Sequence, residues 1–503
     1  MPEFTRVLIA NRGEIALRII RACHEEGLEA VAVYSEADRL SPHVRAADRA
    51  VPIGPSPAID SYLNIGALLA AARATGCGAI HPGYGFLSER APFAEAVERA
   101  GVVFVGPPAS AIRAMGDKTE ARRRMQAAGV PIVPGSTQPV PDASQARIQA
   151  ARIGFPVLLK ATAGGGGKGM RLVRDATELE SAFEAARSES LKAFGADDVY
   201  LEKYLEAPRH IEVQVLADAH GRVIALGERE CSIQRRYQKL IEEAPSVAVS
   251  PAQRRRLGEA ATAAAGSVGY LGAGTIEFLL MSNGAFYFLE MNTRLQVEHP
   301  VTELVYGVDL VREQLRIAAG KPMRVHAGTL NPRGHAIECR ITAEDPFNDF
   351  LPATGVVGYL RVPGGPGVRW DGGVESGNTV TLFYDPLLGK VIVWAETREI
   401  AIERMRRALR ELVIVGLPTS QAFHLRVMDD PAFQRGDLDI NYVQRLGFAK
   451  PGQELRAELV RPLAVVAALL AEERRAVARP LTARPSDRLT AWQAEGRREG
   501  LRE

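Results

Sequence analysis

Two glutamates in Gly274–Asn292 (GTIEFLLMSNGAFYFLEMN) are spaced so that a β-hairpin would place them opposite each other. Asn283 and Gly284, between runs of β-branched and aromatic residues, predict a two-residue type I′ turn, which pairs Glu277 with Glu290. Because like charges directly opposed across a sheet are destabilising, we expect a cation between them, and a hard divalent ion suits two carboxylates. The alternative is that one glutamate faces solvent while the other pairs with an arginine.

A glycine cluster, KATAGGGGKGM, spans Lys160 to Met170. A backbone without Cβ atoms can close on phosphates and present several N–H groups to them. The cluster is not a P-loop, because GxxxxGK[ST] would need glycine at Thr162 and serine or threonine at Gly169. Strand-like residues on both sides instead predict a hairpin flap that folds over a nucleotide. A flexible surface loop is the alternative.

Basic and acidic residues gather in two further segments. In Glu230–Pro245 (ECSIQRRYQKLIEEAP) the basic run predicts an anion site, since arginine forks match carboxylates and phosphates, although a solvated basic face is the alternative. Asn292–Pro300 (NTRLQVEHP) follows directly after Glu290 and adds Arg294 and Glu298. A carboxamide, an arginine and a carboxylate beside a metal pair suit an anionic substrate and a base.

The elements that position these residues begin with an alternation of strands and helices. Such an alternation implies a parallel, doubly wound sheet. The first strand-to-helix turn, ANRGEI, has one glycine, so the GxGxxG dinucleotide fingerprint is absent. We expect strands at Arg6–Ala10, Ala30–Tyr34 and Ala79–His81 and helices at Tyr62–Thr75 and Ser88–Ala100.

Strands dominate after about residue 117, and strands rich in turns return after Gly334. Overall the pattern is α/β, or α+β when the chain is taken as a whole. Strands are expected at Val157–Lys160, Val199–Leu205, Ile211–Leu216, Val223–Gly227 and His335–Thr342, and helices at Lys118–Ala128, Thr177–Ser190, Ala252–Gly269 and Arg398–Arg410.

Composition narrows the class of protein. The 503 residues carry 62 basic and 60 acidic side chains, a net charge of +2, so no global field points to nucleic acid or a membrane surface. The four cysteines form no CxxC pair, which argues against a disulfide framework or a zinc site. No signal peptide and no membrane-spanning apolar run is recognised, so we expect a cytoplasmic protein.

Seven segments together carry a specific resemblance. In this order they are similar to the motifs of biotin carboxylase, an ATP-grasp enzyme, from Arg6 to about Gly447. The segments are HPGYGFLSE (81–89), MGDK (115–118), KATAGGGGKGM (160–170), EKYLEAPRHIEVQ (202–214), ECSIQRRYQK (230–239), EMNTRLQVEHPVTE (290–303) and AIECRITAEDP (336–346).

The resemblance implies a role for each matching residue. Magnesium or manganese would be held by Glu277, Glu290 and Asn292. Bicarbonate would be held by Lys239, Arg294, Val297 and Glu298, and biotin by Tyr84 and Arg340. Arg294, Glu298, Lys239 and Arg340 would be the catalytic residues. ATP would be bound by Lys118, Lys160, Gly166, Gly167, Glu202, Lys203, Tyr204, Leu205, His210, Gln234, Tyr237, Glu277 and Glu290.

Two residues depart from the family pattern. Tyr237 stands where many bacterial relatives have a histidine near the phosphates, and Ala163 replaces a glycine usual at the start of the flap. The resemblance also implies the domains: an N-terminal domain at 1–116, an ATP-grasp domain at 117–334 with a mobile glycine-rich lid at about 132–205, a C-terminal mixed α/β domain at 335–450 and a helical tail at 451–503.

The implied function is ATP- and bicarbonate-dependent carboxylation of biotin, through carboxyphosphate, within an acyl-CoA carboxylase, with acetyl-CoA as the expected acceptor. No methionine precedes a lysine, so a Met-Lys-Met attachment site is absent and biotin is expected on a separate carrier protein. Carboxyltransferase subunits and a homodimer are the other expected partners. The amphipathic tail segment PLAVVAALLAEERRAV packs on its own core or docks on a partner.

Three alternatives stay open at this point. The chain could be the equivalent subunit of a pyruvate or other 2-oxo acid carboxylase. It could be an ATP-grasp ligase that does not use biotin, which would not need HPGYGFLSE or the cluster of Arg294 and Glu298. It could also be an ATP-binding scaffold or sensor without turnover, although such a protein has no use for a base such as Glu298.

Overall fold

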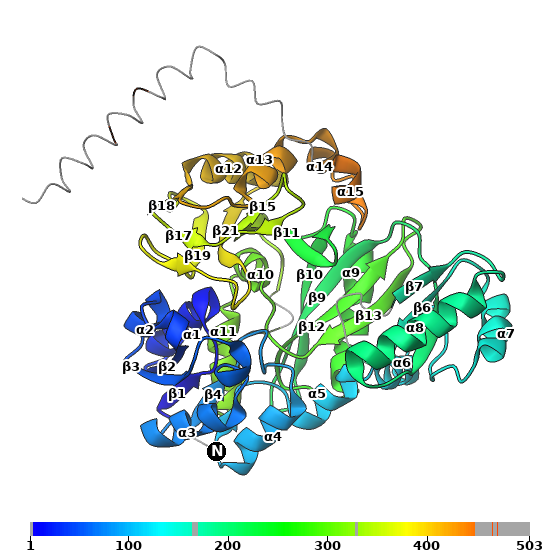
Figure 1. Cartoon of the computed structure of the whole chain (residues 1–503), viewed down its shortest axis with the longest axis horizontal. Coiled ribbons are helices and arrows are strands. Elements are labelled where there is room, and N and C mark those ends of the chain that lie inside the picture. Colours follow the sequence, from blue (N-terminus) through cyan, green and yellow to red (C-terminus); the bar gives the residue numbers. More distant parts are fainter. Residues whose placement is uncertain (1–3, 163–169, 327–329, 448–464, 466–469, 471–503) are drawn as a thin grey trace, which may run out of the picture. The chain divides into compact units, whose positions relative to one another are not determined.

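The computed structural model describes residues 4–162, 170–326 and 330–447, together with Val465 and Leu470 (Figure 1). The chain divides into two units, Met1–Phe448 and Ala449–Glu503. The predicted helical tail therefore lies almost wholly outside the described residues, as do Ala163, Gly166 and Gly167. In the part of the chain that is described, no helix is both long and apolar enough to cross a membrane.

The N-terminal sheet has five parallel strands in the order β3-β2-β1-β4-β5. Val7 and Ile9 of β1 pack with the helices α1 and α11, while Leu8 packs with α3 and α4 on the opposite face. Helices on both faces confirm the doubly wound sheet (Figure 1). The elements are β1 (Arg6–Ile9), α1 (Gly13–Glu25), β2 (Glu29–Ser35), α2 (Pro42–Ala46), β3 (Arg49–Gly54), α3 (Ile65–Thr75), β4 (Ala79–His81), α4 (Ala91–Arg99), β5 (Val103–Phe104) and α5 (Ala109–Gly116).

Helix α3 begins three residues later than predicted. The side chain of Asn64 accepts a hydrogen bond from the Ala67 backbone N–H at 3.0 Å and so caps the helix. Tyr62, which the prediction placed in the helix, is instead buried, stacks on Phe86 and donates its hydroxyl to Asp38 at 2.7 Å. The core contact of Tyr62 therefore decides where the helix begins.

An eight-stranded sheet in the order β13-β12-β9-β10-β11-β14-β21-β19 carries most of the candidate site. Its strands pair antiparallel, and β11 pairs with β14 across the predicted domain boundary at 334/335. One continuous sheet thus joins the two predicted domains. Its strands are β9 (Arg209–Ala217), β10 (Val223–Arg235), β11 (Gln238–Ala244), β12 (Gly272–Leu280), β13 (Phe286–Asn292), β14 (His335–Thr342), β19 (Val368–Gly372) and β21 (Leu387–Ala395).

Strand β10 is longer than the predicted Val223–Gly227, because its second half is polar and yet buried. Glu228, Arg229 and Glu230 are each at most 2% exposed. Their partners lie on neighbouring elements, as in the hydrogen bond from Arg254 Nε to Glu228 at 2.7 Å. Alternation of apolar and polar residues cannot reveal such a strand, since neither face of it is left in water.

The predicted lid contains a separate three-stranded sheet, β7-β6-β8, covered by two helices. Leu159, Phe183 and Leu201 are fully buried in its core. This small core is distinct from those of the large sheet, which fits a part able to move as a body. The elements of this part are α7 (Ala143–Ile153), β6 (Val157–Ala161), β7 (Met170–Val173), α8 (Leu179–Phe194) and β8 (Val199–Lys203), and α6 (Lys118–Ala127) precedes it in the chain.

The remaining helices and short strands complete the described chain. Helix α9 carries the full capping box of Ser250 and Gln253. The helices are α9 (Pro251–Gly266), α10 (His299–Tyr306), α11 (Leu310–Ala318), α12 (Arg398–Glu411), α13 (Gln421–Asp429), α14 (Pro431–Arg435) and α15 (Tyr442–Leu446), and the short strands are β15 (Glu344–Asp345), β16 (Leu351–Pro352), β17 (Gly355–Val356), β18 (Tyr359–Arg361), β20 (Thr379–Val380) and β22 (Val413–Val415).

The β12–β13 hairpin confirms that Glu277 pairs with Glu290, but by another route than predicted. The turn is one residue longer than a two-residue type I′ turn: the Met281 N–H donates to the Ala285 carbonyl at 2.8 Å, and Gly284 has a φ of 83°. This longer loop would move the pairing by one residue. Phe278 pairs with Phe288 and Glu277 with Glu290, so Leu289 is an extra residue on β13. This bulge restores the pairing of the two glutamates.

A buried ion pair in this sheet gives the first testable prediction. Glu243 accepts hydrogen bonds from His335 Nε2 at 2.7 Å and Arg398 Nε at 2.6 Å. Burial alone would raise the pKa of Glu243, but His335 and Arg398 outweigh it and lower this pKa to about 2. Because its pKa is lower in the folded protein, ionised Glu243 stabilises the fold at pH values above the ordinary pKa of 4.5. This contribution is lost as the pH falls from 4.5 towards 2.

We expect the substitution Glu243→Gln to lower the free energy of unfolding at pH 7 by about 3 kcal/mol, because Arg398 stays buried without its counter-charge. Below pH 4 the deficit should shrink, since the wild type then loses the same contribution. Urea unfolding of both proteins between pH 3 and 7 measures this. A deficit that is constant over the whole range would contradict the ion-pair explanation.

Candidate active site

Lys239 on β11 lies at the centre of the candidate site. Its ammonium group donates to Glu277 at 2.8 Å and to Glu298 at 2.7 Å, and also to Glu212. Glu212 on β9 and Glu277 on β12 are directly paired in the sheet. Burial alone would lower the pKa of Lys239, but the three carboxylates outweigh it and raise this pKa well above its usual value. One cation therefore holds three buried carboxylates together.

Glu298 precedes α10 and is fully buried beneath this cluster. Arg340 on β14 donates to Glu298 at 2.9 Å and, through Nε, to Glu242 at 2.6 Å. Burial would raise the pKa of Glu298, but Lys239, Arg340 and Arg229 hold it well below its usual range. At neutral pH the side chain is a carboxylate and can accept a proton. Its two strongest partners are cations that an incoming anion can share.

Arg294 lies in the loop after β13, directly beside the hairpin. Its Nε donates to Glu89 at 2.8 Å, and its other nitrogens donate to Gln296 at 3.1 Å and to Asn292 at 3.3 Å. The side chain is 18% exposed, so the guanidinium group is both fixed and accessible. Glu89 belongs to the HPGYGFLSE segment, which connects that segment to the predicted anion site.

The predicted metal ligands lie on one face of the hairpin. Glu277 and Glu290 are paired, and Asn292 is two residues further along the same strand. The Asn292 amide donates to Glu277 at 2.8 Å. Glu290 is exposed, so its carboxylate is available. Two carboxylates and a carboxamide are hard oxygen donors of the kind that Mg²⁺ or Mn²⁺ prefers, so these residues fit the expected ion.

Among the described residues, His210, Glu212 and Glu277 also lie close enough together to share an ion. Lys239 already contacts both of these glutamates, and His210 Nε2 lies 3.1 Å from Glu277. The space between Glu212 and Glu277 is therefore filled by an ammonium group. The pair of Glu277 and Glu290 is therefore the one that we expect to hold a metal.

A second group of residues lies towards the lid. Lys160 Nζ and Arg122 Nη1 donate to the two oxygens of Glu202 at 2.6 and 2.5 Å. Burial would raise the pKa of Glu202, but the two cations lower it. Lys118 is the first residue of α6, and burial lowers its pKa against the opposing pull of Glu290. Basic side chains at a helix N-terminus suit the phosphates of a nucleotide.

Two of the predicted nucleotide residues, Lys203 and Gln234, use their side chains in hydrogen bonds to the main chain. Lys203 Nζ donates to the carbonyls of Gly154 and Phe155 at 3.0 and 2.9 Å, so any contact of this residue with a nucleotide must come from its main chain. The Gln234 amide donates to the Cys231 carbonyl at 2.7 Å. Tyr237 is 62% exposed at the β10–β11 turn. Gly166 and Gly167 fall outside the described residues.

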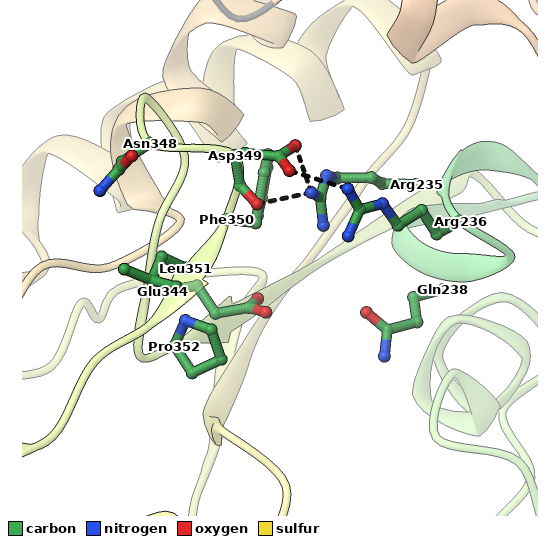
Figure 2. Close-up of a pocket in the computed structure, with 9 residues that line it drawn as sticks. All are labelled: Arg235, Arg236, Gln238, Glu344, Asn348, Asp349, Phe350, Leu351 and Pro352. Carbon is green, nitrogen blue, oxygen red and sulfur yellow. Dashed lines mark hydrogen bonds and ion pairs between the residues drawn. The ribbon is translucent and has the colours of Figure 1, made fainter.

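The turn that carries Tyr237 borders a separate cavity (Figure 2). Arg235 and Arg236 both donate to Asp349, at 2.5 and 2.8 Å, and Arg235 lies over the Phe350 ring at 4.9 Å. The predicted basic run therefore divides. Lys239 enters the central cluster, whereas the two arginines pair with Asp349 at the cavity, Arg235 with a largely buried side chain and Arg236 with an exposed one.

Sequence reasoning gave no role to the buried side chains that support the site. Arg229 is fully buried and binds Glu212, Gln214 at 2.8 Å and Thr302 at 2.9 Å. Arg122 holds Glu202 from the opposite side to Lys160. No local signal in the sequence marks them, because Arg229 lies in a polar half-strand and Arg122 in a highly charged helix, where a solvated side chain would look the same.

Tyr84, which is predicted to line the biotin pocket, lies beside α1. Its hydroxyl donates to Glu14, the second residue of that helix. Burial raises the pKa of Tyr84 well above its usual value, Glu14 raises it further, and Arg340 opposes this rise. Tyr84 is thus electrostatically coupled to Arg340, which also contacts Glu298. The predicted biotin and bicarbonate residues meet through this arginine.

The lid sheet, the large antiparallel sheet and the carboxylate pair on its hairpin define an ATP-grasp fold. Residues 117–326 match the family described as "Carbamoyl-phosphate synthase L chain, ATP binding domain". Residues 3–112 match the "Biotin carboxylase, N-terminal domain" family and residues 338–445 the "Biotin carboxylase C-terminal domain" family. The chain therefore belongs to the biotin carboxylase family.

Individual relatives support this family membership. The biotin carboxylase of Haemophilus influenzae is 54% identical over 441 residues, covering 88% of this chain and 98% of the relative. One of the pyruvate carboxylase subunits of Methanothermobacter thermautotrophicus is 52% identical over 440 residues, covering 88% of this chain and 89% of that relative.

Solved structures are similar over the same part of the chain. A biotin carboxylase complex from Campylobacter jejuni has a TM-score of 0.86 and 47% identity, covering 88% of this chain and 99% of the other. The biotin carboxylase domain dimer of the Hydrogenobacter thermophilus 2-oxoglutarate carboxylase, a complex with MgADP, ADP and bicarbonate, has a TM-score of 0.85 and 47% identity, covering 90% and 100%.

Proposed function

We propose that this chain catalyses the ATP- and bicarbonate-dependent carboxylation of biotin. The single observation that carries the proposal is the arrangement around Lys239, where a buried carboxylate, Glu298, is held between Lys239 and Arg340 beside the accessible Arg294. This arrangement offers cations for an anionic substrate and a base for its proton. The membership of the family supports the same activity.

In the first half-reaction Glu298 removes the proton of bicarbonate while Lys239, Arg294 and the Val297 backbone hold its charge. The bicarbonate oxygen then attacks the γ-phosphorus of ATP, and ADP leaves with the electrons of the broken P–O bond. The nucleotide is bound by Lys118, Lys160, His210, Glu202, Lys203, Tyr204 and Leu205. Glu277, Glu290 and Asn292 would hold Mg²⁺ or Mn²⁺, which when bound neutralises the triphosphate.

In the second half-reaction the product, carboxyphosphate, breaks down to CO₂ and phosphate. The phosphate takes the proton of the biotin ureido nitrogen, and this nitrogen forms a bond to the carbon of CO₂. Arg340 stabilises the negative charge that develops on the ureido oxygen, and Tyr84 lines the pocket of the ring. Exclusion of water protects the labile intermediate, which is the role we assign to the glycine-rich lid.

We further propose that biotin arrives on a separate carrier protein and that carboxyltransferase subunits use the product, with a homodimer of this chain as the working form. The dimer in the Hydrogenobacter structure supports the last point. For the acceptor we propose an acyl-CoA, on the resemblance of the final segment, TAWQAEGRREGLRE, to longer acyl-CoA carboxylase chains. A pyruvate or 2-oxo acid carboxylase would use the same half-reaction.

The experiment uses the purified full chain, MgATP, free biotin and ¹⁴C-bicarbonate. We expect label in a biotin adduct that is stable in alkali and decomposes in acid. Absence of the adduct while ATP is consumed would overturn the proposal in favour of another ATP-grasp ligase.

A second experiment tests the acceptor: the chain is purified with its native partners, and label transfer to acetyl-CoA, pyruvate and 2-oxoglutarate is compared. Transfer to a 2-oxo acid alone would refute the acyl-CoA proposal.

A further inference from the structure

Lys390 is a fully buried lysine on β21 that none of the steps above uses. It is paired in the sheet with Arg340 on one side and with Asp371 on the other. Its ammonium group donates to the Val297 carbonyl at 2.6 Å and lies 3.2 Å from Glu14 Oε1. Both contacts lead to the candidate site. The side chain thus joins the C-terminal part of the sheet to the residues expected to bind both substrates.

The surroundings of Lys390 are unusual for a residue that only stabilises the fold. The carboxylates nearby are those of Glu14, Glu338 and Asp371. Within the described residues, neither oxygen of Glu338 and only one oxygen of Glu14 has a hydrogen-bond partner. Well-packed apolar residues would commonly be at least as stable in such a place as buried charges. A buried charge cluster with unmet hydrogen bonds, directly below the site, therefore points to a functional reason.

The contact with Val297 has a specific geometrical consequence. The Val297 carbonyl and the Glu298 N–H belong to the same rigid peptide unit. Holding that carbonyl fixes the direction from which the Glu298 side chain leaves the backbone. Glu14, the other partner of Lys390, accepts the hydroxyl hydrogen of Tyr84. One ammonium group is therefore connected to the residue expected to act as base and to the residue expected to line the biotin pocket.

We propose that Lys390 is a positioning residue that sets the Val297–Glu298 peptide against bicarbonate and couples it, through Glu14 and Tyr84, to biotin. This inference rests on the proposed function. Lys390 does not contact the nucleotide residues Lys118 or Lys160 through any of its hydrogen bonds. Its removal should therefore affect the use of bicarbonate and not the binding of ATP.

The test compares the variants Lys390→Met, Glu14→Gln and the double variant with the wild-type chain. Methionine keeps the length of the side chain and removes its three donors. The double variant removes the buried charge that Lys390→Met alone would leave unpaired, so it keeps the test valid where the single variant does not fold. The assay is ATP hydrolysis at varied bicarbonate without biotin, which keeps the effect of Glu14 on Tyr84 out of the measurement.

Relative to Glu14→Gln, we expect the double variant to lose about 100-fold in kcat/KM for bicarbonate, as for a displacement of about 1 Å in a reacting group. Its Kd for MgATP should stay within about twofold. The control is Arg398→Met, which removes another buried cation outside the site and should lower the melting temperature without changing KM for bicarbonate.

A folded double variant with the same kcat/KM for bicarbonate as Glu14→Gln would overturn the inference, because Lys390 would then serve only the fold. A parallel loss in ATP affinity would overturn it as well. The failure of the proposed function would look different, since the wild-type chain itself would then show no dependence on bicarbonate or biotin.

Discussion

The substitution Glu298→Gln is expected to reduce kcat for bicarbonate-dependent ATP hydrolysis by about 10²- to 10⁴-fold, the usual range for loss of a general base. Glutamine keeps the shape of the side chain but cannot take the proton of bicarbonate. Because Glu298 bonds to Lys239 and Arg340 and not to the lysines of the nucleotide group, the Kd for MgATP should stay within about twofold. Stopped-flow or coupled assays of ADP release, with calorimetry for binding, measure both.

A matched control is Glu228→Gln, which changes another buried glutamate, on β10. Glu228 pairs with Arg254 and accepts the Ser246 N–H, away from Lys239. Its substitution should lower stability and leave kcat per folded molecule unchanged. If Glu298→Gln kept more than a tenth of the wild-type kcat, the base would have to be another group.

The substitution Lys239→Met is expected to have the largest combined effect on stability and activity. It removes the one cation shared by Glu212, Glu277 and Glu298. Uncompensated buried charge of this kind costs about 3–5 kcal/mol in the free energy of unfolding. Bicarbonate would also lose a direct partner, so turnover should fall at least about 10³-fold.

The pH dependence separates this explanation from simple loss of packing. Burial alone would raise the pKa values of Glu277 and Glu298, but Lys239 keeps both below the ordinary 4.5. The wild type therefore gains stability from these groups above pH 4.5 and loses it as the pH falls below that value. In Lys239→Met these groups lose the largest of the charges that lower their pKa values, so the variant gains less stability than the wild type as the pH rises.

The two stability curves should approach each other as the pH falls below 4.5, because the wild type then progressively loses the contribution that the variant lacks. Denaturant unfolding at pH 4 and pH 7 is sufficient to check this. Lys321→Met, an exposed lysine, is the control and should change the free energy of unfolding by less than about 0.5 kcal/mol at both pH values. A gap between wild type and Lys239→Met that is equal at both pH values would contradict the shared-cation explanation.

The opposition of Glu277 and Glu290 shows what sequence reasoning could and could not provide. The pairing was predicted correctly, although the turn is longer than predicted and a bulge at Leu289 compensates. A short turn motif and alternating side chains carry the register, but a bulge leaves little trace in sequence because it depends on packing of both strands. The correct pairing thus followed from an incorrect loop.

The buried supports of the site were out of reach for a physical reason. Lys390 occurs in a largely apolar strand and Arg229 in a polar half-strand, and in neither case does anything local tell whether the charge faces water or a distant carboxylate. Their partners lie far along the chain, as Glu14 does from Lys390. The residues predicted to meet the substrates fall in short, distinctive motifs, whereas those that hold them in place are specified only by the folded sheet.

We propose that Lys239, Arg294 and Glu298 form a bicarbonate site coupled to ATP and biotin. The most direct measurement is ATP hydrolysis by the purified chain with magnesium, with and without bicarbonate and with and without free biotin. We predict little hydrolysis without bicarbonate and a clear rise when biotin is added. Hydrolysis that is indifferent to both, or tight ATP binding with no hydrolysis under any of these conditions, would contradict the claim.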